Sequence, residues 1–194
     1  MVWVLLGPLG VAIAKDLDLS HAEKGLMVAT PVLAGAILRI VMGILVDRLS
    51  PKKAAIIGQV VVIGALAYAW LAGIHSYAEV LVLGCFLGVA GSSFAAALPL
   101  ASRWYPAEHQ GTAMGIAGAG NSGTALAALF APGLAAAFGW GNVFGLALIP
   151  LVIVFFIFIV MAKDAPNPPP PKKLAEYLAV LKDKDAWWFM FFYS

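Results

Sequence analysis

Long apolar runs with few charges constrain what this chain can fold into more than any other feature. Each run is long enough to cross a bilayer, because a helix of about 20 residues spans the roughly 30 Å hydrocarbon core. With 62% hydrophobic and 11% charged residues, the chain has more apolar surface than a water-soluble domain can bury. The sequence therefore predicts an all-α membrane protein. The expected spans are residues 23–46, 54–74, 80–102, 110–138 and 142–162.

Both ends of the sequence resemble parts of further helices. Residues 1–14 are apolar from the second residue but too few to cross a bilayer, so we interpret them as the remnant of a first helix. A signal peptide is the alternative, because residues 12–14 resemble a cleavage site, but the basic n-region is missing. The expected division is a six-helix bundle over residues 1–162, a Pro-rich cytoplasmic linker with a short surface helix (174–181) over 163–185, and the start of a seventh span over 186–194.

The loop charges predict how the chain lies in the membrane. The opposite loops hold only two lysines, together with acidic residues, and basic residues favour the cytoplasmic side. The loops after the second, fourth and sixth spans are therefore expected in the cytoplasm. Their basic residues are Arg48, Lys52, Lys53, Arg103, Lys163, Lys172, Lys173, Lys182 and Lys184.

Arg39 is a cation in the middle of an otherwise apolar span. It lies about 12 Å along the helix from Asp47, which is near the membrane midplane. A charge at that depth costs about 2.5–3.5 kcal/mol on insertion scales and usually marks a substrate or ion pathway. The alternatives are a snorkelling side chain or a carboxylate on a neighbouring helix. No other span carries Asp or Glu, so we expect no acidic partner within the spans.

The fifth expected span opens with a cluster of glycines around one amide. Close helix packing through small residues is one explanation, and Gly111 and Gly115 fit it. Packing does not explain Asn121, because a polar group in hydrocarbon needs a partner. A helix-to-helix hydrogen bond is one such partner, and an anion that accepts from the amide is another. The remaining glycines of the cluster are Gly118, Gly120 and Gly123.

The turn after the second span carries Gly43, three residues, Asp47-Arg48 and then a pair of lysines. This pattern resembles the loop between the second and third helices of the major facilitator superfamily, except that Ser50-Pro51 stands where glycine is usual. The resemblance implies that Asp47 and Arg48 are gating residues. It also implies that Asp47 meets a helix N-terminus of the other half of the protein, a partner that this chain lacks. A solvated loop is the alternative.

Further motifs resemble the nitrate/nitrite porter family of that superfamily. Residues 118–123 are similar to its fifth-helix glycine-asparagine signature, and 36–39 to the second helix, whose Arg binds the anion. Residues 88–94 are similar to the fourth helix, whose Phe stacks on the flat ion. The resemblance implies six substrate-binding residues, which are Arg39, Phe94, Gly118, Gly120, Asn121 and Gly123.

The chemistry of these residue types fits a planar anion. A guanidinium offers a flat fork of donors to two oxygens, which matches nitrate and nitrite. An aromatic ring cannot attract an anion with its face, but it forms a flat wall that tetrahedral phosphate or sulfate does not fit. We therefore expect Arg39 to supply the attraction and Phe94 the shape.

The sequence predicts the first half of a bacterial cell-membrane porter for nitrate, nitrite or both, working by alternating access with a second six-helix half. Two alternatives remain open: a porter for another small anion, and a membrane anion sensor that does not transport. We expect no enzyme activity, metal, cofactor or nucleic-acid partner, because no catalytic or ligand cluster is present. The lack of a carboxylate or His within the spans favours exchange over proton symport.

Overall fold

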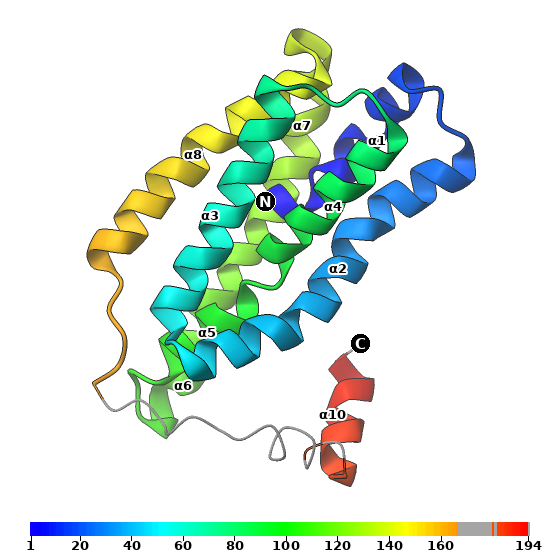
Figure 1. The fold of residues 1–194 in the computed structure, drawn as a ribbon. Coiled ribbons are helices and arrows are strands. Elements are labelled where there is room, and N and C mark those ends of the chain that lie inside the picture. Colours follow the sequence, from blue (N-terminus) through cyan, green and yellow to red (C-terminus); the bar gives the residue numbers. More distant parts are fainter. Residues whose placement is uncertain (167–179, 181, 194) are drawn as a thin grey trace.

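The computed structural model describes residues 1–166, 180 and 182–193, and within them every regular element is a helix (Figure 1). This confirms the all-α fold class. The predicted surface helix and most of the predicted linker lie outside these residues. The described elements are η1 (Val2–Val4), α1 (Leu6–Asp16), α2 (His21–Arg48), α3 (Pro51–Leu71), α4 (Tyr77–Gly91), α5 (Phe94–Ser102), α6 (Ala107–Gly118), η2 (Ala119–Ser122), α7 (Gly123–Phe138), α8 (Trp140–Met161) and α10 (Lys184–Tyr193).

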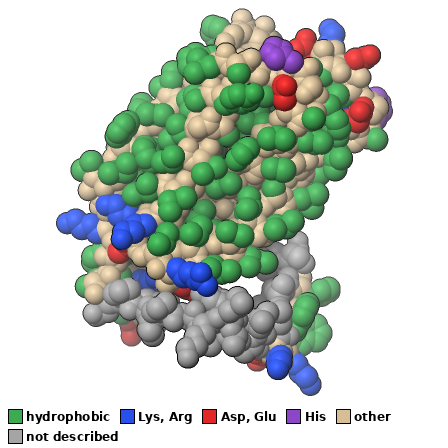
Figure 2. Space-filling view, in the orientation of Figure 1, with side chains coloured by type: hydrophobic (Ala, Val, Ile, Leu, Met, Phe, Trp, Pro, Cys, Tyr) green, Lys and Arg blue, Asp and Glu red, His purple; other side chains and the backbone are tan. Residues whose placement is uncertain are grey.

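Five helical stretches are long and apolar enough to cross a membrane: His21–Arg48, Pro51–Leu71, Tyr77–Ser102, Ala107–Phe138 and Trp140–Met161. All five predicted spans are thereby confirmed, with ends shifted by a few residues. Figure 2 shows a mostly hydrophobic surface between two ends that carry the charges. Lys and Arg gather where α2 ends and α3 begins, and acidic and His side chains are visible at the opposite end.

Capping explains where two of these spans begin. The Ser20 hydroxyl accepts from the Glu23 backbone N–H while the Glu23 carboxylate accepts from the Ser20 N–H, so α2 begins at His21. Ser50 accepts from the Lys53 N–H and Pro51 occupies the first turn, so α3 begins three residues before the predicted start. Ser50-Pro51, the departure from the superfamily pattern, is therefore a helix start.

Two of these stretches, Tyr77–Ser102 and Ala107–Phe138, are not continuous α-helices. The first is divided at Ser92–Ser93 between α4 and α5, and the second passes through the 3₁₀ turn η2 between α6 and α7. At the first break the Ser92 hydroxyl donates to the Val89 carbonyl (2.7 Å), and it competes there with the regular helical bond. At the second, the glycines around Ala119–Ser122 have low helix propensity.

The first helix is short but belongs to the bundle core. At about 1.5 Å per residue, the 11 residues of α1 reach only about 16 Å, so α1 does not cross a bilayer alone. Its side chains Leu6, Leu9 and Ile13 are fully buried in the main hydrophobic cluster, together with Leu87 of α4 and Phe144 of α8. This burial favours a bundle helix over a signal peptide.

Candidate anion site and an ion pair between α2 and α5

Arg39 stands on the inward face of α2. The buried residues of this helix are Met27, Pro31, Gly35, Met42 and Val46. They repeat at helical spacing except for one gap between Gly35 and Met42. Arg39 occupies that gap, because it lies four residues after Gly35 and three before Met42. The Arg39 side chain is exposed, and within the described residues no carboxylate forms an ion pair with it.

Packing sets the level of Arg39 against the break between α4 and α5. The two neighbouring helices α2 and α4 run in the same direction (Figure 1). A methyl group at Gly35 would lie 3.2 Å from the Gly88 carbonyl oxygen and 3.5 Å from the Gly91 Cα. Further along, Met42 shares a buried cluster with Ala96. Arg39 lies between these two contacts on α2, so it is level with the Ser92–Ser93 break and the start of α5.

The two helix breaks meet at one cavity of about 300 Å³. Phe94 of α5 lines it, together with Gly120 and Asn121 of η2. Gln59 of α3 also lines the cavity, and its buried side-chain oxygen has no hydrogen-bond partner in the described part of the chain. The structure thus brings together three of the six predicted binding residues. Arg39 is not among the lining residues.

The glycines of α6 and η2 do not serve packing inside this bundle. A Cβ at Gly111, Gly115, Gly118 or Gly120 would meet no heavy atom within 4 Å, apart from the backbone of its own helix and the two adjacent residues. The close-packing explanation therefore fails for them among the described residues. Gly123 differs, because a Cβ there would lie 3.2 Å from the Met1 Cβ. Gly118 and Gly123 do not line the cavity.

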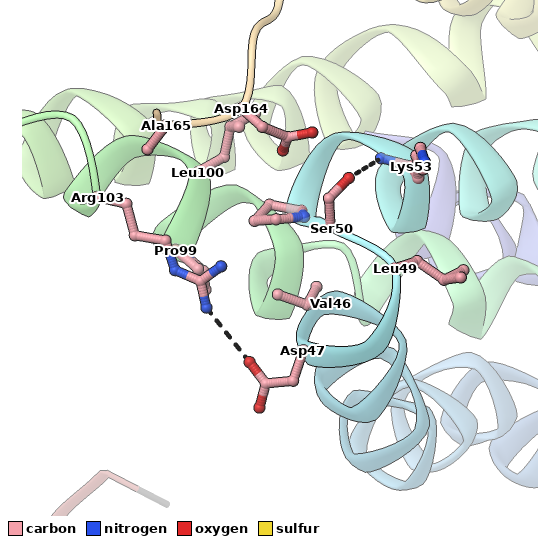
Figure 3. A pocket seen from close by; sticks show the side chains of 11 residues that line it. Val46, Asp47, Leu49, Ser50, Lys53, Pro99, Leu100, Arg103, Asp164 and Ala165 are labelled. Carbon is pink, nitrogen blue, oxygen red and sulfur yellow. Dashed lines mark hydrogen bonds and ion pairs between the residues drawn. The ribbon is translucent and has the colours of Figure 1, made fainter. Parts of the chain in front are cut away.

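Asp47 has a partner within this chain, in addition to the helix N-terminus of the other half that the superfamily resemblance implies. The Arg103 guanidinium donates to the Asp47 carboxylate at 3.3 Å, with both side chains 21% exposed (Figure 3). This pair joins the end of α2 to the end of α5. Sequence reasoning counted Arg103 only as a loop charge, because the two residues are 56 positions apart. Arg48, the other predicted gating residue, is exposed.

The segment after α8 is attached to the same end of the bundle. The Asp164 carboxylate accepts from the Lys52 backbone N–H at 2.9 Å, so it caps the N-terminus of α3 with a favourable charge. The Trp104 ring N–H donates to the Lys163 carbonyl at 2.9 Å. Asp47, Arg103 and Asp164 line one cavity of about 290 Å³ (Figure 3). No sequence motif marked Asp164 as a cap.

Membrane-spanning helices, a cation within a span and interrupted helices around a cavity are the features of a membrane transporter bundle. The chain belongs to the Major Facilitator Superfamily, whose family model matches residues 1–194. It is thus an integral, multi-pass membrane protein of a transporter family.

Several named relatives are similar to this chain. A probable nitrate/nitrite transporter NarK2 of Mycobacterium tuberculosis is 39% identical over 165 residues, covering 84% of this chain and 42% of the relative. A nitrite extrusion protein of Bacillus subtilis is 30% identical over 193 residues, covering 100% and 48%. A probable nitrate transporter NarT of Staphylococcus carnosus is 30% identical over 194 residues, covering 100% and 49%.

These relatives confirm the resemblance to nitrate/nitrite porters. The chain spans less than half the length of each of the three relatives. No solved structure matches the chain.

Proposed function

We propose that this chain is the N-terminal half of a carrier that moves nitrate, nitrite or both across a bacterial cell membrane. The observation that carries the proposal is Arg39, an exposed cation on the inward face of a spanning helix, level with the start of α5 at Phe94. The names of the relatives support the choice of anion. In this proposal residues 1–162 are the transmembrane bundle, 163–185 the connection and 186–194 the start of the next span.

The proposed binding mode follows from the geometry of the anion. Nitrate and nitrite are flat, and two of their oxygens match the donor fork of Arg39. Phe94 provides a flat wall beside the ion, and Asn121 provides an amide donor. Gly118, Gly120 and Gly123 permit close approach of the anion or of a facing helix, and the open surroundings of Gly118 and Gly120 support this role.

Transport requires the second half of the protein. Two six-helix halves would rock about a site at the membrane midplane, and the second half would close the face that exposes Arg39 and the α6 glycines. Asp47 and Arg48 would gate the cytoplasmic side, with the loops after the second, fourth and sixth spans in the cytoplasm. The proposal includes no enzymatic step.

The test is uptake by the full-length protein that contains this chain. Purified protein in liposomes is offered nitrate, nitrite or phosphate, with and without a proton gradient. We expect uptake of the two planar anions and not of phosphate, and dependence on internal nitrite rather than on the gradient would establish exchange. Phosphate uptake would contradict the planar site, and absence of any flux with retained anion binding would favour a sensor.

A further inference from the structure

A close contact between helices α2 and α4 lies beside the proposed anion site. Helices α2 and α4 form the most extensive pair, and glycines of α4 face α2 along the contact. At Gly88 an added Cβ would lie 2.6 Å from the Ala34 Cβ and 2.8 Å from the Gly35 backbone nitrogen. Side-chain rotation cannot relieve either distance, because one partner is a Cβ and the other is backbone. Any side chain at position 88 therefore requires α2 and α4 to move apart.

The other two glycines of α4 on this side of the helix are less constrained. At Gly84 the nearest atom is the Thr30 methyl at 3.1 Å, and at Gly91 it is the Trp3 ring at 3.1 Å. Both neighbours are side chains and lie beyond the 3.0 Å below which real Cβ contacts essentially never occur. A Cβ at Gly64 of α3 meets nothing within 4 Å. Gly88 is thus a specific point of contact between two backbones.

The position of this contact couples it to both proposed binding side chains. Arg39 lies one helical turn beyond Gly35, about 6 Å along α2. Phe94 begins α5 directly after the short Ser92–Ser93 break that follows α4, and the buried Ser92 fixes that break through its bond to the Val89 carbonyl. A shift of α2 against α4 would change the separation of Arg39 and Phe94, because packed helices transmit displacement.

We propose that Gly88 is a positioning residue: the absence of its side chain sets the distance between α2 and α4, and through it the placement of Arg39 relative to Phe94. This inference rests on the proposed function. It predicts that Gly88→Ala weakens anion binding without removing any group that touches the anion.

The first experiment measures the kinetics of nitrate and nitrite uptake by the full-length protein in liposomes. Gly88→Ala is compared with Gly64→Ala, the matched change at an open position. Because a displacement of about 1 Å at a site can cost up to about 100-fold, we expect the KM of Gly88→Ala to rise about tenfold or more while Gly64→Ala resembles wild type. A KM equal to that of wild type, with equal protein recovered, would overturn the inference.

A second variant covers the case in which Gly88→Ala does not fold. Adding Ala34→Gly removes the 2.6 Å contact but leaves the contact with the Gly35 nitrogen. We therefore expect the double variant to fold and to show a KM above that of wild type, because the contact with the Gly35 nitrogen still displaces the helices. A double variant with recovered folding and a wild-type KM would reduce Gly88 to a purely structural role.

A spin-label distance separates this inference from the proposed function. Cys85 of α4 is exposed and is the single cysteine of these 194 residues, and Ile37→Cys adds an exposed site on α2. Any cysteine in the rest of the full-length protein is replaced by serine. Gly88→Ala should lengthen the distance between the labels, and Gly64→Ala should not. An unchanged distance would overturn the positioning role whatever the protein transports. Wild-type protein that takes up no planar anion would refute the proposed function, while the distance still decides the helix contact.

Discussion

At the scale of single residues, the helix period determines where Arg39 points. Four residues after Gly35 and three before Met42, it falls on the face that α2 otherwise buries. An unpaired cation there is unfavourable, and an anion that accepts two hydrogen bonds from the guanidinium compensates for it. Lysine carries the same charge but lacks the planar fork, so the two residue types distinguish charge from geometry.

Arg39→Lys should raise the KM for nitrate about tenfold or more, because losing one hydrogen bond to a charged group costs about 1.5–3 kcal/mol. Lys15→Arg, in the last turn of α1, is the control, and we expect it to leave uptake unchanged. Liposome uptake over a range of nitrate concentrations measures both. An unaltered KM in Arg39→Lys would show that the fork is not used.

At the scale of helices, contacts between elements distant in sequence hold the bundle together. Trp70 of α3 donates from its ring N–H to the Asn142 side-chain oxygen of α8 (3.2 Å), and its ring covers Gly145. At the other end, Asp47 and Arg103 join α2 to α5. Each contact fixes a helix pair that local hydropathy leaves undetermined.

Gly145→Ala should lower stability, because a Cβ there would lie 2.6 Å from the Trp70 ring. Overpacking of this kind typically costs about 1–3 kcal/mol. Gly141→Ala on the same helix is the matched control, since a Cβ at Gly141 meets nothing within 4 Å. Thermal unfolding in detergent should show a lower midpoint for Gly145→Ala only. Equal midpoints would mean that the ring moves aside without penalty.

Exchanging the charges of the α2–α5 ion pair separates its two proposed roles. Asp47→Arg and Arg103→Asp should each lower thermal stability, and the double variant should recover it, by about 0.5–1 kcal/mol. Transport should not recover, because a cation at position 47 cannot face the positive end of a helix in the other half. Recovery of transport in the double variant would contradict the gating role of Asp47.

At the scale of the whole molecule, the charges divide between two ends of an apolar bundle (Figure 2). This arrangement fits a protein that crosses a bilayer, since the spans satisfy their backbone hydrogen bonds internally and the charged loops remain in water. The excess of Lys and Arg where α2 ends and α3 begins predicts the cytoplasmic side.

Labelling of single cysteines tests this orientation in intact cells. In the full-length protein with Cys85→Ala and any cysteine outside these 194 residues also replaced, an impermeant thiol reagent should label Ser76→Cys before α4 and not Glu108→Cys at the start of α6. Permeabilised cells should show labelling at both sites, which controls for reactivity. The reverse pattern would invert the proposed orientation.

The sequence by itself determined the membrane class, the five apolar helical stretches and the residue types of the proposed anion site. These features are local. A run of apolar residues in a membrane has to form its backbone hydrogen bonds within the run, which requires a helix. A charge such as Arg39 within that run can be recognised without knowing how the helix packs. The superfamily motifs could also be found in this way, because they are short and contiguous.

Only the tertiary structure decided which distant residues meet. It divided two predicted spans at Ser92–Ser93 and Ala119–Ser122, brought Phe94 and Asn121 to one cavity that excludes Arg39, and paired Asp47 with Arg103. Hydropathy and periodicity carry no information on such contacts, because they describe neighbours along a helix. The distance between two helices depends instead on the side chains at their crossing, as the contact of Gly88 with Ala34 and Gly35 illustrates.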